Sequence, residues 1–183
     1  VATELGVSAE HIQKALSHFE GIGRRMHMYG DIKTECGVVT LIDDYAHHPV
    51  EVAATIKTAT EVWPERRIVA VFQPHLYSRT RDLLDEFAGA FGDADLAVVT
   101  DVYPARERPV DGVSGRLVVD RARALALCDV SYVEDVSGLP EYLLTLVRPG
   151  DAVVFMGAGD IWRYSRVFAG AVSPHEVKTT PRI

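Results

Sequence analysis

The chain has 183 residues, of which 48% are apolar and 25% charged, enough for one globular domain with a buried core. A formal net charge of −7 argues against general nucleic-acid binding, and no apolar run approaches the roughly 20 residues that cross a bilayer. Cys36 and Cys128 are too few and too far apart for a zinc framework, so we expect free thiols in a reducing cytoplasm.

Residues 1–20 are predicted to be the end of a preceding domain or a linker helix. After Ser8, a candidate N-cap, apolar residues recur at helical spacing, at Ile12, Ala15, Leu16 and Phe19. Because the chain starts with Val1 next to this helix, we expect a fragment of a longer polypeptide. The domain itself is predicted to span 21–172, followed by a flexible polar tail at 173–183.

From residue 24 onward, predicted strands and helices alternate. Residues 24–35 are weakly predicted to form a strand, and a turn at Cys36–Gly37 leads into a second strand at 38–42. Further strands are predicted at 67–72, 95–100, 130–134 and 151–156, and helices at 49–63, 80–91, 114–127, 137–148 and 160–170. Apolar strands separated by amphipathic helices are typical of a parallel sheet covered on both faces. We predict an α/β, Rossmann-like fold with a mostly parallel sheet and room for an antiparallel strand or hairpin near its start.

Polar residues follow four of the predicted strands at the point where each strand ends. They are Asp44, Tyr45 and His47, then His75 and Arg79, then Asp101 and Tyr103, and finally Gly157-Ala158-Gly159-Asp160. The carboxyl ends of parallel strands share one edge of a sheet, and ligands bind at that edge in α/β proteins. The sequence therefore predicts a ligand site there.

Two adjacent pairs in this set leave alternatives open. Of Asp43 and Asp44, we expect one to cap the following turn and the other to bind a ribose hydroxyl. His47 and His48 point in opposite directions on an extended segment, so we expect one to face a substrate carboxylate and the other to bond within the domain. No partner follows at metal-ligand spacing, and we predict no metal site. A metal-dependent hydrolase using both histidines and His75 is an alternative.

Arginines near predicted turns are candidate anion ligands. Arg79 and Arg81 lie in the first turn of a predicted helix, where a guanidinium can bind a carboxylate or phosphate through two hydrogen bonds, and Arg79 is the stronger candidate. Arg24 and Arg25 are placed to reach a nucleotide phosphate. Residues 157–160 match only half of a dinucleotide fingerprint, so a tight turn with its aspartate as N-cap suffices to explain them.

These clusters resemble the C-terminal domain of the Mur ligase family. The resemblance covers roughly residues 19–170, and the strings that carry it are Gly23–Met26, Asp43–Glu51, Phe72–Asp82, Asp101–Glu107 and Gly157–Ile161. It implies part of an ATP-dependent, amide-bond-forming ligase of cytoplasmic peptidoglycan synthesis. The substrates implied are ATP, UDP-N-acetylmuramate and L-alanine, with Mg²⁺ held mainly by another domain.

The resemblance also implies roles for individual residues. Arg25, Asp44 and Tyr45 are expected to bind ATP. His47, His75 and Arg79 are expected to bind the amino acid, and the catalytic residues implied are Arg25, His47 and Arg79.

Two positions depart from the family pattern: Ala46 stands where Gly is frequent and Leu76 where Arg is frequent. Leu76 removes one guanidinium from the implied amino-acid site. The domain alone is not expected to turn over substrate. A nucleotide-binding or regulatory module without catalysis is the alternative function.

Overall fold

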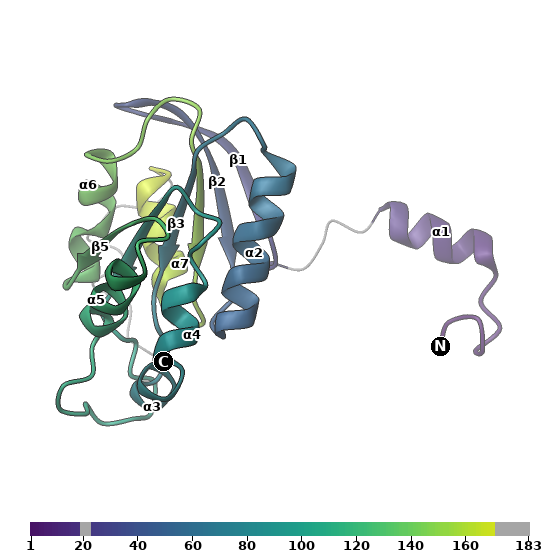
Figure 1. Ribbon diagram of the computed structural model, residues 1–183. Helices are drawn as coiled ribbons and strands as arrows, with labels where there is room; N and C mark the ends of the chain where they lie inside the picture. Colours follow the sequence, from purple (N-terminus) through teal and green to yellow (C-terminus); the bar gives the residue numbers. More distant parts are fainter. Residues whose placement is uncertain (19–22, 171–183) are drawn as a thin grey trace.

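The computed structural model describes residues 1–18 and 23–170, and Figure 1 shows its ribbon. In chain order the elements are α1 (Ala9–Ser17), β1 (His27–Thr34), β2 (Gly37–Asp44), α2 (Pro49–Val62), β3 (Ile68–Phe72), α3 (Tyr77–Asp82), α4 (Leu84–Gly89), β4 (Leu96–Thr100), α5 (Gly115–Leu125), β5 (Asp129–Val133), the 3₁₀ turn η1 (Val136–Gly138), α6 (Leu139–Leu144), β6 (Ala152–Met156) and α7 (Ile161–Phe168).

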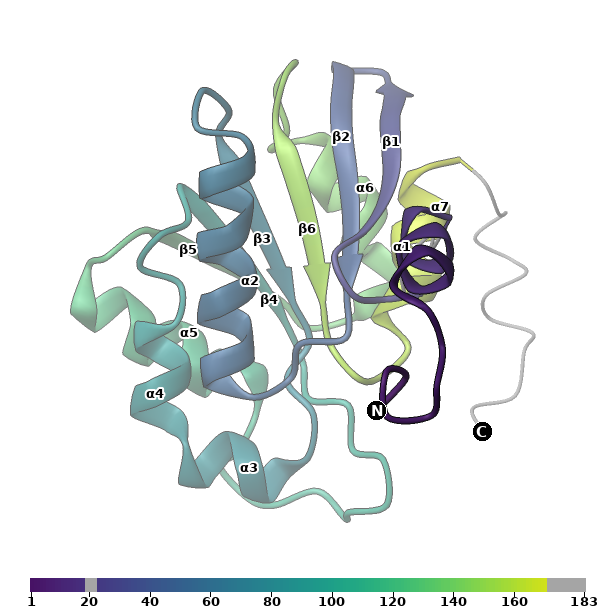
Figure 2. The ribbon, with the colours of Figure 1, turned by 90° about the vertical axis from the view of Figure 1, so that its right-hand side faces the viewer.

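The six strands form one sheet in the order β1-β2-β6-β3-β4-β5. β2, β6, β3, β4 and β5 run parallel, and β1 pairs antiparallel with β2 as a hairpin. Figure 2 shows this hairpin at one side of the sheet. The predicted α/β fold, with a mostly parallel sheet and a hairpin at its start, is confirmed.

Helices cover both faces of the sheet, because the central strands are apolar on both sides. Every residue of β3 and β6 is buried. One apolar cluster joins the sheet to α2, α4 and α5, and a second joins the opposite face to α6 and α7. In the first cluster the Phe72 ring packs against Phe87 and Phe91, with ring centroids 5.3 and 5.9 Å apart.

Two helix starts show how local sequence sets the element boundaries. Ser8 caps α1 through the His11 N–H, as predicted, whereas Phe19 lies outside the described residues. No residue of α1 is buried, and in Figure 1 this helix lies away from the sheet. α2 begins at Pro49, and His48 and Glu51 form a reciprocal capping box at its start.

Two predicted helices differ from the structure. The helix expected at 80–91 begins earlier, at Tyr77, and is broken into α3 and α4 at Leu83, whose φ of −116° and ψ of 31° are not helical. The N-cap residue of α3, Leu76, makes no side-chain hydrogen bond to the helix. The start of α3 is fixed by Glu107, whose carboxylate accepts the Ser78 N–H at 2.9 Å. The helix expected at 137–148 is the 3₁₀ turn η1 followed by a short α6.

Among the described residues, no helix is long and apolar enough to cross a membrane. The longest, α2, has 14 residues.

Replacing Phe72 by Ala is expected to lower the free energy of unfolding by about 3–5 kcal/mol, because the ring is fully buried between two other aromatic rings. Val50→Ala, at a side chain that is 72% exposed, is the matched control and should change stability by less than about 0.5 kcal/mol. Urea unfolding of the chain measures both. Similar small effects of the two substitutions would contradict this account of the core.

Candidate functional site

The carboxyl ends of β2, β3, β4 and β6 meet at one edge of the sheet. Main-chain hydrogen bonds join the segments that follow them: Gly157 N–H donates to Asp44 O at 3.2 Å, Tyr103 N–H to Pro74 O at 2.8 Å, and Leu76 N–H to Tyr103 O at 3.0 Å. The polar clusters predicted from sequence therefore lie on one continuous surface.

Four aromatic side chains form a row along this surface. The ring centroids of Tyr45 and His47 are 5.1 Å apart, those of His47 and His75 are 5.9 Å apart, and the rings of His75 and Tyr103 stack at 5.7 Å. Burial, followed by the charges of Arg79 and His47, lowers the pKa of His75. The lowered pKa favours the neutral form of His75, and its Nδ1 is buried without a hydrogen-bond partner among the described residues.

The two neighbouring histidines have separate roles. The His47 ring faces His75 within the aromatic row. The His48 ring instead accepts a hydrogen bond from the Val50 N–H at the start of α2. His47 Nδ1 also lies 2.8 Å from the Tyr45 carbonyl oxygen, so both rings have partners within the domain, and a histidine facing a substrate carboxylate stays a prediction.

Arg79 projects toward the row from α3. It is half-buried, and its Nη1 lies 3.5 Å from the His47 carbonyl oxygen. Arg81 is 56% exposed and pairs with the adjacent Asp82. Of the two arginines, Arg79 is the one that reaches the cluster.

The structure assigns different places to Asp43 and Asp44. Asp44 accepts the Met26 N–H at 2.6 Å and the Ala46 N–H at 2.7 Å, so it closes the turn after β2. Asp43 has no exposed surface and no hydrogen-bond partner, and its Oδ2 lies 3.5 Å from Arg24 Nε. Burial raises the pKa of Asp43 to about 6, against the opposing effect of Arg24. The expected division into one cap and one ribose ligand is therefore wrong for Asp43, which no ligand can reach.

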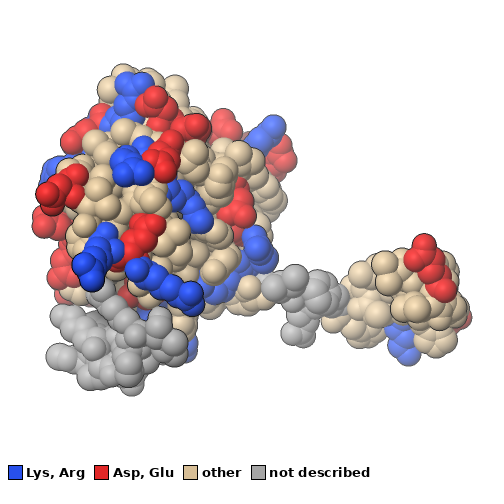
Figure 3. All heavy atoms as spheres, turned by 90° about the horizontal axis from the view of Figure 1, so that it is seen from below, with Lys and Arg blue, Asp and Glu red and all other residues tan. Residues whose placement is uncertain are grey.

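The residues before β1 bring positive charge to the site. The guanidinium carbons of Arg24 and Arg25 lie 4.9 and 5.7 Å from the centroid of the Tyr45 ring, within cation–π distance. Arg25 is exposed. Figure 3, which views the molecule from below Figure 1, shows several Lys and Arg side chains on this face, with Asp and Glu side chains among them.

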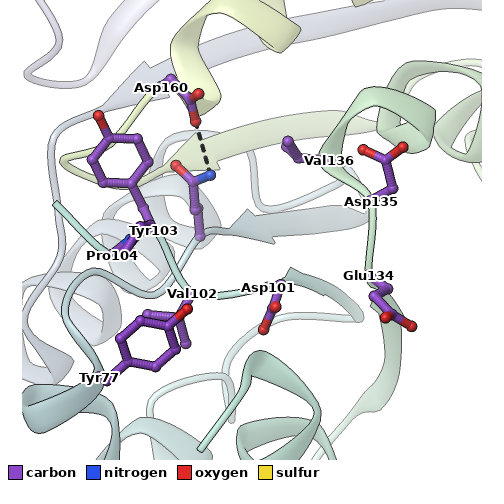
Figure 4. A pocket seen from close by; sticks show the side chains of 10 residues that line it. Tyr77, Asp101, Val102, Tyr103, Pro104, Glu134, Asp135, Val136 and Asp160 are labelled. Atoms are coloured by element: carbon purple, nitrogen blue, oxygen red, sulfur yellow. Dashed lines mark hydrogen bonds between the residues drawn. The ribbon is translucent and has the colours of Figure 1, made fainter. Parts of the chain in front are cut away.

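Two pockets open on this edge, and both are lined by Tyr103 and Asp160. The first, shown in Figure 4, has a volume of about 260 Å³ and contains four carboxylates, those of Asp101, Glu134, Asp135 and Asp160. The second has a volume of about 300 Å³ and combines two guanidinium groups with aromatic rings, those of Arg24, Arg163, Tyr45, Tyr103 and Trp162. Of the two, the second has the chemistry for an anionic or planar ligand.

Several residues of this edge were not assigned a place from the sequence. Gln73 donates to Asp160 at 3.0 Å and accepts the Ile161 N–H at 3.2 Å, so Gln73, and not the predicted Asp160, holds the first residue of α7. Trp162 and Arg163 line the second pocket. In the sequence both look like ordinary residues of an amphipathic helix, and no local signal distinguishes them.

Within residues 1–18 and 23–170, no group of three His, Cys, Asp or Glu side chains is arranged to hold a metal ion. His47, His48 and His75 do not share a centre, since His48 caps α2. The described residues therefore offer no preformed site for Mg²⁺.

Comparison with known proteins matches residues 6–159 to a family model described as Mur ligase, glutamate ligase domain. The chain is 46% identical over 168 residues to a UDP-N-acetylmuramate–L-alanine ligase of Geobacter sulfurreducens, covering 92% of this chain and 36% of that protein. It is 48% identical over 168 residues to a protein of the same name from Salinibacter ruber, covering 92% and 34%. The chain thus spans about a third of the length of these curated relatives.

Solved structures agree with this match. A UDP-N-acetylmuramate–alanine ligase from Thermotoga maritima superposes with a TM-score of 0.74 at 31% identity, covering 92% of this chain and 34% of that one. A murein peptide ligase from Psychrobacter arcticus shares the fold, with a TM-score of 0.68 at 24% identity, covering 100% and 35%.

Asp43→Asn is expected to raise the free energy of unfolding at pH 7.5 by roughly 1–3 kcal/mol, because one pKa unit corresponds to about 1.4 kcal/mol. The raised pKa means that neutral Asp43 stabilises the fold below about pH 4, and that this stability is lost as the pH rises through about 6. The gain from the amide should therefore vanish at pH 4. Urea unfolding at the two pH values measures it, and an equal effect at both would contradict the assigned pKa.

Proposed function

Because this chain belongs to the Mur ligase family, we propose that it is the C-terminal domain of an ATP-dependent ligase that adds L-alanine to UDP-N-acetylmuramate in peptidoglycan synthesis. The observation that carries the proposal is the meeting of His47, His75 and Arg79 on one edge, in a chain 46–48% identical to such ligases. Since the chain is about a third of their length, the other substrate sites belong to the rest of the polypeptide.

The proposed reaction forms an amide in two steps. The sugar carboxylate attacks the γ-phosphorus of ATP, which gives an acyl phosphate and ADP. The amine of L-alanine then attacks the acyl carbon and loses a proton, and the tetrahedral intermediate expels inorganic phosphate. Both steps need fixed cations near developing negative charge and a defined orientation of the two reactants.

We assign the amino-acid side of the site to Arg79, His47 and His75. Arg79 provides a half-buried guanidinium whose planar fork suits a carboxylate. The His47 ring and the neutral His75 ring lie beside it, where they can orient the amino acid by hydrogen bonds. Leu76 brings no charge to this side, which leaves Arg79 as the main carboxylate ligand.

We assign the ATP side to Arg25, Tyr45 and Asp44. Arg25 is exposed and next to the Tyr45 ring, so it is free to turn toward a phosphate when the rest of the protein closes on this edge. Tyr45, which is 36% exposed, offers a ring face to the nucleoside. Asp44 has spare lone pairs for a ribose hydroxyl beyond the two it uses for backbone N–H groups. The sequence contains no Gly-x-x-x-x-Gly-Lys-Ser/Thr string, so another domain must cradle the phosphates.

Arg79→Ala in the full-length protein that contains this domain is expected to reduce kcat/KM for L-alanine roughly 10- to 100-fold, since a hydrogen bond to a charged group is worth about 1.5–3 kcal/mol. Phosphate release from ATP, with UDP-N-acetylmuramate present, measures the rate with L-alanine, glycine, L-serine and D-glutamate. Arg81→Ala, which removes an exposed guanidinium two residues away, is the matched control and should leave the rate unchanged.

The same assay separates the proposal from a module that binds nucleotide without catalysis. A folded wild-type protein that releases no phosphate in response to any of the four amino acids would reject the ligase. Full activity of Arg79→Ala would retain the ligase but place the carboxylate ligand elsewhere.

A further inference from the structure

Arg24 joins three segments that meet at the site. Its guanidinium donates to the Gly157 carbonyl at the start of the β6–α7 turn, lies over the Tyr45 ring and pairs with Asp43. Its own carbonyl accepts the Tyr45 N–H at 2.7 Å. Arg24 also has a φ of +61°, a conformation that a non-glycine residue keeps only when its surroundings hold it there.

Asp43 is the buried partner of Arg24. Asp43 and Asp44 are consecutive residues of β2, so their carboxylates lie on opposite faces of the sheet, and Asp43 lies on the face that α7 covers. The charged and titratable groups around it are Arg24 before β1, His27 and Tyr29 on β1, and Asp44 on β2; Arg166 of α7 faces Tyr29.

We propose that Arg24 and Asp43 are a positioning pair that holds residues 23–26, here called the arm, against the carboxyl edge of the sheet and so places Arg25 and Tyr45 for ATP. The inference rests on the proposed ATP site and adds to it Arg24 and Asp43, as residues that act by positioning Arg25 and Tyr45. Arg25 follows Arg24 directly in the chain. Tyr45 contacts Arg24 twice, because its N–H donates to the Arg24 carbonyl and its ring lies under the Arg24 guanidinium.

The pair contributes placement more than stability. A buried carboxylate without a hydrogen bond is costly, and the raised pKa of Asp43 means that its neutral form is the more favourable for folding. The ionised form does have one specific effect, because it attracts Arg24 into the position where the guanidinium also reaches Gly157. Protonation of Asp43 removes that attraction and should loosen the arm.

Amide hydrogen exchange on the chain itself tests the placement without any catalysis. The reporters are the N–H groups of Tyr45, bonded to Arg24 O, and of Met26, bonded to Asp44. In Asp43→Asn we expect their protection, corrected for intrinsic exchange, to fall about tenfold or more at pH 7.5. In the wild type we expect a similar fall between pH 7.5 and pH 5, and in the variant no such fall.

The matched control is Asp31→Asn, which neutralises another carboxylate of the β1–β2 hairpin, one paired with Arg66. It should exchange like the wild type. Wild-type protection of Tyr45 and Met26 in Asp43→Asn at pH 7.5 would overturn the proposal. A pH step that persists in Asp43→Asn would overturn the role of Asp43.

A second experiment ties the placement to ATP in the full-length protein. Arg24→Met keeps the stem but not the charge, and we expect KM for ATP to rise about tenfold while KM for L-alanine stays within about twofold. Arg24→Lys should restore part of the loss. Cooperative unfolding of each variant shows that it is folded.

Unchanged KM for ATP in a folded Arg24→Met variant would overturn the positioning role. If the wild type itself shows no ligase activity, the proposed function fails, while the hydrogen-exchange result still decides whether the pair holds the arm.

Discussion

The site depends on one constraint, the parallel alignment of strands that are buried on both faces. β6 lies between β2 and β3, and its register places Met156 beside both Asp44 and Phe72, so these strands end at the same level. The residues after each strand can then bond across to the next segment. Apolar packing from both faces holds these strands, and with them the edge they share.

Above this sheet, side chains that bond to distant backbone groups fix the loops. Gln73 holds the start of α7, and Glu107 holds the start of α3. Gly159 allows the β6–α7 turn to approach the Tyr103 ring, since a Cβ at this position would lie 2.5 Å from Tyr103 Cγ. These contacts give Arg79 and the aromatic row defined positions although both lie on short loops or at a helix start.

The distribution of charge gathers several arginines at one edge of an acidic chain. The net charge is −7, yet Arg24, Arg25, Arg79 and Arg163 all lie on the carboxyl edge. Three of the four carboxylates in the acidic pocket do not line the pocket that contains Arg24 and Arg163. Arg24 and Arg25 lie over the Tyr45 ring and Arg163 lies over the Trp162 ring, and the faces of aromatic rings attract cations.

The sequence by itself determined the alternation of strands and helices, the hairpin at the start and the shared polar edge, because apolar periodicity and strand-end residues are local patterns. It also indicated Arg79 over Arg81 and the opposite directions of His47 and His48. Only the tertiary structure decided that Asp43 is buried beside Arg24 while Asp44 closes the turn, that Gln73 replaces Asp160 as the partner of α7, and that Glu107 starts α3. The contacts of Glu107 and Gln73 join residues 29 and 88 positions apart, and no local pattern records which distant group will be within hydrogen-bonding distance.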